Sequence, residues 1–153
     1  MKKITAIEAS KFILMTLRKK YKPIGFFENI SLLKLFSLLY YVQSYHLAMF
    51  NKPLFYDKIE IWNNSIVVPN VNDWFVNEIK TVNFLNTQKT DKSILSKKQK
   101  RLIKDVLSIY NKYSAYGLIE KIKMEQPWLE TYEVDKKTVI SKNKLKRFFI
   151  QYV

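Results

Sequence analysis

The sequence contains no cysteine, only one histidine and only two glycines in 153 residues. Without cysteine the chain cannot form a disulfide, a thiol nucleophile or a zinc finger, and one imidazole cannot build a multi-histidine metal cage. The two glycines, Gly25 and Gly117, are too few for a dinucleotide-binding or phosphate-cradling loop. We therefore expect neither a metal nor a cofactor.

Apolar residues make up 48% and charged residues 26% of the chain, which is typical of a globular protein and excludes a disordered one. The length suits a single domain, residues 1–153. The sequence starts with basic residues, but Glu8, Ser10 and Lys11 follow where a signal peptide would have its apolar segment. A cytoplasmic protein is the expectation.

Positive charge dominates, with a formal net charge of +14. Such an excess would draw the chain to nucleic acid, an anionic membrane surface or an acidic protein. Base readout and phosphate clamping favour arginine, however, and only Arg18, Arg101 and Arg147 are present among the 27 basic residues. We therefore favour a general surface charge, concentrated at residues 97–104 and 136–147, and keep nucleic acid as a possible but not favoured partner.

Helical periodicity predicts a mainly α fold around a central buried helix at about residues 31–50. Its apolar positions lie on nearly every face, which is typical of a helix enclosed on all sides. Lys34, Gln43 and His46 interrupt the apolar run, so we expect no membrane span. Further helices are predicted at about 6–19, after a cap at Asn70 through Ile79, and from a capping box at Ser96 and Gln99 through Tyr113. A shorter helix is predicted after a cap at Ser114, ending before Pro127 because proline breaks a helix, and a final one at about 141–151.

A small β-hairpin-like element is predicted at about residues 58–68. Lys58–Trp62 alternates as a strand does, and Ile66–Val68 is a second β-type run. Asn63 and Asn64 between them suit a tight turn, because asparagine tolerates a positive φ. The polar tract Asn86–Ser93 is predicted to be a surface loop.

Residues with possible chemistry favour packing over catalysis. His46, Tyr40 and Tyr41 lie within the central helix, where a buried structural role is favoured over proton transfer or base stacking. Glu120 and Glu125 are not at helical contact spacing and so predict no acid/base pair. We therefore expect no enzyme.

Trp128 follows a Glu-Gln-Pro sequence and is predicted to lie outside a regular helix. Its ring either fills the core from a loop, which is the favoured alternative, or anchors a partner, because large rigid aromatic residues are frequent at binding hot spots. The residues that we select as candidate partner contacts are Asn63, Asn64, Lys97, Lys98, Lys100, Trp128 and Tyr132.

Three stretches carry a family resemblance. The most specific one runs from Leu33-Lys34-Leu35 through Tyr40-Tyr41-Val42-Gln43 to Lys52-Pro53-Leu54-Phe55. The second joins Glu60-Ile61-Trp62 to Val67-Val68-Pro69, and the third extends from Leu95 to Glu125-Gln126-Pro127-Trp128. In order and spacing, these stretches resemble the Panacea domain, a bacterial and phage-associated family.

The resemblance implies a mainly helical, antitoxin-like domain that neutralises a cognate protein toxin by direct contact and is encoded by prophages or mobile elements. It also implies an alternative, an adaptor that delivers the toxin to an ATP-dependent protease. A nucleic-acid-binding regulator that uses the basic surface is a further alternative, although no helix-turn-helix with an arginine-, asparagine- or glutamine-rich reading face is recognisable.

Overall fold

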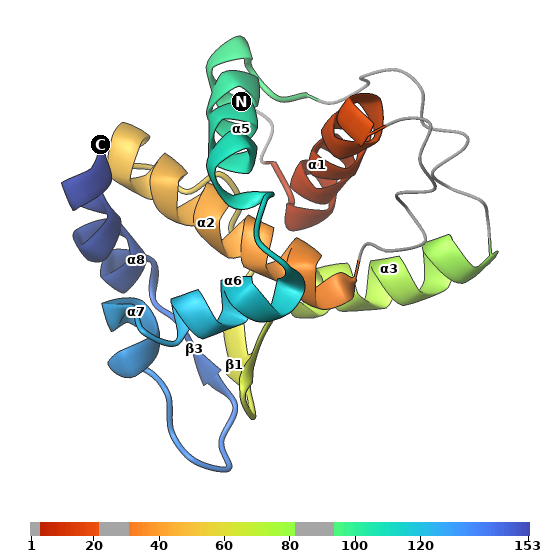
Figure 1. The fold of residues 1–153 in the computed structure, drawn as a ribbon. Helices are drawn as coiled ribbons and strands as arrows, with labels where there is room; N and C mark the ends of the chain where they lie inside the picture. The colour runs from red at the N-terminus through yellow and green to blue at the C-terminus, as the bar shows by residue number, and fades with distance from the viewer. Residues whose placement is uncertain (1–3, 22–30, 82–93) are drawn as a thin grey trace.

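The computed structural model describes residues 4–21, 31–81 and 94–153 (Figure 1). Helix α2 (Leu32–Phe50) crosses the middle of the molecule, and its residues 35–47 are all buried. Ser31 caps its start by accepting a hydrogen bond from the Lys34 N–H at 3.1 Å, and Asn51 ends it in the left-handed conformation, at φ 57°. The predicted mainly α fold around a central buried helix is confirmed.

Helices α5 (Lys97–Tyr110), α6 (Ala115–Ile122) and α8 (Lys142–Phe149) pack directly against α2. The predicted capping box of Ser96 and Gln99 is present with both hydrogen bonds. The Lys34 ammonium donates to the carbonyl oxygen of Asn111 at 2.9 Å, so α5 ends beside the start of α2. Helix α5 stops at Tyr110 and does not continue to Tyr113 as predicted.

Helices α1 (Ala6–Tyr21) and α3 (Pro69–Thr81) contact each other, and α1 also contacts α2 and lies beside α5 (Figure 1). One carboxylate joins the starts of α1 and α3, because Asp57 accepts from the backbone N–H of Ala6 at 2.9 Å and from the side-chain amide of Asn70 at 2.8 Å. An acidic group at a helix start is favoured by the helix dipole. Asn70 was predicted to precede its helix as the cap, but it lies inside the first turn, since Pro69 suits the first helical position.

The β element is a three-stranded antiparallel sheet in the order β2-β1-β3. Strands β1 (Glu60–Trp62) and β2 (Ser65–Val67) form the predicted hairpin, in which Trp62 pairs with Ser65 and Asn63 takes φ 55° in the turn. Strand β3 (Thr138–Val139) was not predicted, because a two-residue strand has too few positions to show an alternating pattern.

The last third of the chain contains two departures from the predicted helices. Gln126–Leu129 forms the short helix α7, so Trp128 lies inside a helical turn and not outside one as expected. Pro127 permits this, because a proline in the first turn lacks only an N–H that would have no partner within the helix. The helix predicted at 141–151 is shorter, since α8 ends at Phe149 and the 3-10 turn η2 (Ile150–Tyr152) follows.

The predicted surface loop at 86–93 lies outside the described residues. Across residues 4–21, 31–81 and 94–153, no helix is long and apolar enough to cross a bilayer. Within the same ranges, no three histidine, cysteine or acidic side chains are grouped so that they could hold a metal ion.

Candidate partner-binding surface

His46 bridges α2 to the start of α5. It is buried, and its Nδ1 lies 2.6 Å from the carbonyl oxygen of Lys52, which assigns the proton to that nitrogen because a carbonyl can only accept. Its Nε2 then accepts from the side-chain amide of Gln99 at 3.4 Å. Burial lowers the pKa of His46, so the ring is held neutral as a structural bridge.

Glu125 meets Tyr40 and Tyr41 in the interior, a contact that the sequence patterns did not indicate. The Glu125 side chain accepts from the hydroxyl of Tyr40 at 3.1 Å and from that of Tyr41 at 3.2 Å, and Glu125 is 7% exposed. Burial raises its pKa to about 7, against the opposing effect of the two hydrogen bonds. The signal that could have revealed it is chemical, because two buried tyrosine hydroxyls each need a partner.

An aromatic cluster continues from these tyrosines toward the end of α2. Tyr41 stacks on Tyr110 with ring centroids 3.8 Å apart, and the hydroxyls of Tyr110 and Tyr45 lie 2.8 Å apart. Phe149 packs edge-on against Tyr40 and Tyr41. Burial raises the pKa of all four tyrosines, so their hydroxyls remain protonated: Tyr40 and Tyr41 donate to Glu125, and Tyr45 and Tyr110 share one hydrogen bond.

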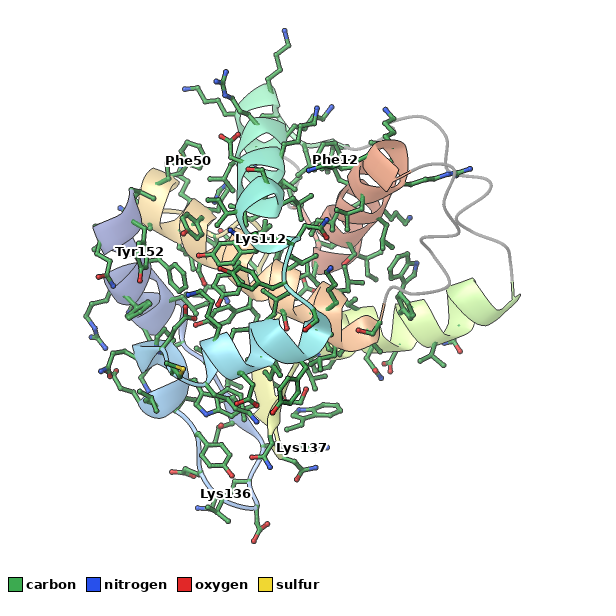
Figure 2. The ribbon with its side chains drawn as sticks, viewed as in Figure 1. Phe12, Phe50, Lys112, Lys136, Lys137 and Tyr152 are labelled. Carbon is green, nitrogen blue, oxygen red and sulfur yellow. The ribbon has the colours of Figure 1, made fainter. Side chains whose placement is uncertain are left out.

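The outer edge of this cluster forms the floor of an open hollow of about 500 Å³, which we call the C-terminal groove. It lies between the end of α2, one face of α5 and η2, where Figure 2 shows Phe50 and Tyr152. Met49 is 53%, Ile109 46% and Tyr152 54% exposed. A contiguous apolar surface of this kind is typical of an interaction site, unlike single exposed apolar residues. The groove is lined by Tyr45, Met49, Phe50, Lys98, Arg101, Leu102, Asp105, Val106, Ile109, Tyr152 and Val153.

Positive charge lies along the start of the α5 wall. Lys98 and Arg101 are exposed, line the groove and stand three residues apart, so they share one helix face. Lys98 also borders a neighbouring hollow of about 490 Å³ beside His46. Lys97 is exposed and Lys100 half-buried, but neither lines the groove. Of the three lysines predicted as contacts, the structure therefore places Lys98 alone at this surface.

The remaining predicted contacts lie elsewhere. Asn63 and Asn64 are exposed at the hairpin tip, which Figure 1 shows at the opposite end of the molecule from α5. Trp128 is 4% exposed and stacks on half-buried Tyr132, with centroids 5.4 Å apart. Burial supports the packing alternative for Trp128, because little of its ring is left for a partner. The structure does not bring the predicted contacts together into one surface.

A comparison with protein families adds an independent finding. The model of the family described as "Antitoxin SocA-like, Panacea domain" matches residues 35–129, which is more than half of the 153-residue chain. No curated protein and no solved structure matches the chain. The matched region contains nearly all of α2 and the whole of α5, and so includes two walls of the C-terminal groove.

Proposed function

The chain belongs to the family of SocA-like antitoxins with a Panacea domain, and we propose that it neutralises a cognate protein toxin by direct contact at the C-terminal groove. The observation that carries this proposal is the open apolar hollow with exposed Met49, Ile109 and Tyr152. A few large side chains of this kind can supply most of the energy of an interface. The basic surface, with Lys98 at the rim, would speed the encounter with an acidic partner.

In this proposal the protein acts by binding and not by catalysis. The burial of Glu125 and its bonds to Tyr40 and Tyr41 support a structural role for the best candidate acid. The same proposal places the protein in the cytoplasm with its toxin, encoded on a prophage or mobile element.

The test uses the product of the neighbouring reading frame as the toxin. It is expressed with the wild-type protein, with a groove variant or with a control variant, and growth is scored. The groove variant, Met49→Gln with Ile109→Gln, replaces two exposed apolar side chains with a good helix former. The control, Met124→Gln with Val134→Gln, changes two apolar residues outside the groove that are more exposed still, at 79% and 70%.

We expect growth with the wild-type protein and the control, and growth arrest with the groove variant. Equal rescue by all three proteins would refute the groove as the contact surface. Rescue accompanied by a fall in toxin abundance that requires an ATP-dependent protease would favour the adaptor alternative. Binding to operator DNA that weakens linearly with the logarithm of salt concentration would favour the nucleic-acid alternative.

A further inference from the structure

The α5 wall of the C-terminal groove changes character along its length. Groove-lining residues recur every three or four positions, as one face of a helix requires. That face begins with the cations Lys98 and Arg101, continues through Asp105 and ends with the apolar Ile109. An occupant of matching chemistry therefore has an apolar surface with negative charge near one end.

The walls of the groove favour a helix as the occupant. They are built from α2, α5 and η2, whose backbone groups bond within their own elements. An extended segment would find no strand edge there, and its own N–H and C=O groups would lose water against apolar side chains without gaining partners. A helix satisfies its backbone internally and presents side chains at i, i+3, i+4 and i+7 to a hollow.

The rim of the groove, formed by Lys98 and Arg101, favours carboxylates on that helix. Among the described residues, Lys98 and Arg101 form no ion pair within 4.0 Å, so their charges are available to a partner. They lie in the first turns of α5, where the helix dipole adds positive potential. Arginine can hold a carboxylate with two parallel hydrogen bonds. Nucleic acid fits less well, because the hollow is mainly apolar and offers few cations to a run of phosphates.

We infer that the C-terminal groove binds an amphipathic helix of a partner protein, with its apolar face in the hollow and its carboxylates paired with Lys98 and Arg101. The identity of the partner as the toxin rests on the proposed function. The chemistry of the bound segment does not depend on that proposal, and it can be tested without any toxin.

The probe is a fluorescein-labelled 14-residue peptide with an alanine-rich background. It carries leucines at i, i+4, i+7 and i+11 and three glutamates in its first turn, where they also favour its own helix. A matched control peptide has lysines in place of the glutamates. Fluorescence anisotropy measures the Kd of each peptide for the full chain at low and high salt.

Two charge variants of the protein localise the effect. Lys98→Glu with Arg101→Glu changes the rim, and Lys58→Glu with Lys112→Glu lowers the net charge equally at exposed sites outside the groove. Both rim substitutions place carboxylates near a helix start, which favours the fold. Circular dichroism of each variant and binding by the Met49→Gln, Ile109→Gln variant complete the set.

We expect the glutamate peptide to bind about tenfold more tightly than the lysine peptide, which is a typical difference in Kd for one or two charge-assisted contacts. The rim variant should lose this preference, the distant variant should keep it, and the apolar variant should weaken both peptides. Equal binding of the two peptides, or binding of neither, overturns the inference. Displacement of the peptide by a DNA duplex, or by self-association of the protein through the groove, overturns it as well.

The two tests can fail separately. Peptide binding without rescue of growth would leave the groove as a helix-binding site and reject the toxin as its partner. Rescue that depends on Met49 and Ile109, without discrimination between the peptides, would keep the antitoxin proposal and reject the acidic helix.

Discussion

Replacing Glu125 with glutamine should make the protein more stable above pH 7 and leave it nearly unchanged at pH 4. The carboxyl group is buried and accepts hydrogen bonds from Tyr40 and Tyr41. Glutamine has nearly the same shape and its carbonyl oxygen can accept from both hydroxyls, but it cannot ionise. The substitution therefore removes the cost of a buried negative charge and little else.

The size of the effect follows from the pKa of Glu125, which burial raises from its ordinary value of 4.5 to about 7. Between these two values the unfolded chain loses the proton while the folded protein keeps it, so ionisation favours unfolding as the pH rises. A difference of this size is worth about 3 kcal/mol at full ionisation. The wild-type free energy of unfolding should therefore lose about 3 kcal/mol, relative to the variant, between about pH 4.5 and pH 7.

Urea denaturation from pH 4 to pH 9 measures this difference. His46 acts in the opposite direction, because its pKa is lowered by burial and its protonation below the ordinary value of 6.5 favours unfolding. Subtracting the wild-type curve from the variant curve cancels that effect, since both proteins contain His46. The control is Glu133→Gln, which alters an exposed carboxylate paired with Lys136. A difference curve that is flat with pH would refute the assignment of a neutral Glu125.

Three further predictions concern single contacts. Tyr41→Phe removes a hydrogen bond that lowers the pKa of Glu125, so that pKa should rise above about 7 in a carboxyl carbon NMR titration. Gln43→Leu leaves the buried backbone groups of Leu54 and Phe55 unpaired and should lower the free energy of unfolding in urea by about 2–4 kcal/mol. Asn63→Ala should cost about 1 kcal/mol in thermal unfolding because of the left-handed turn, whereas Asn63→Gly should cost less.

Local patterns predicted the elements whose causes lie within a few residues. Residues 35–47 are mostly apolar, with apolar positions on nearly every face, and they form the buried helix that this pattern favours. The Ser96 and Gln99 capping box joins residues three apart, and the Asn63 turn needs only a residue that tolerates positive φ. The same local reasoning failed at Gln126–Leu129, because proline was interpreted as ending a helix when it also suits the first turn of a new one.

The groove and the Glu125 cluster depend on contacts between distant parts of the chain. Glu125 lies 85 residues from Tyr40, and no periodicity connects them. The groove forms because the chain returns after α8 and places Tyr152 against Tyr45 and Phe149 beside the end of α2. In the sequence, Met49, Ile109 and Tyr152 are each one apolar residue near the end of a helical pattern, and only the packing of three elements makes them one surface. A chemical rule, that buried hydroxyls require partners, points to a missing acceptor, but the identity of that acceptor follows from the fold.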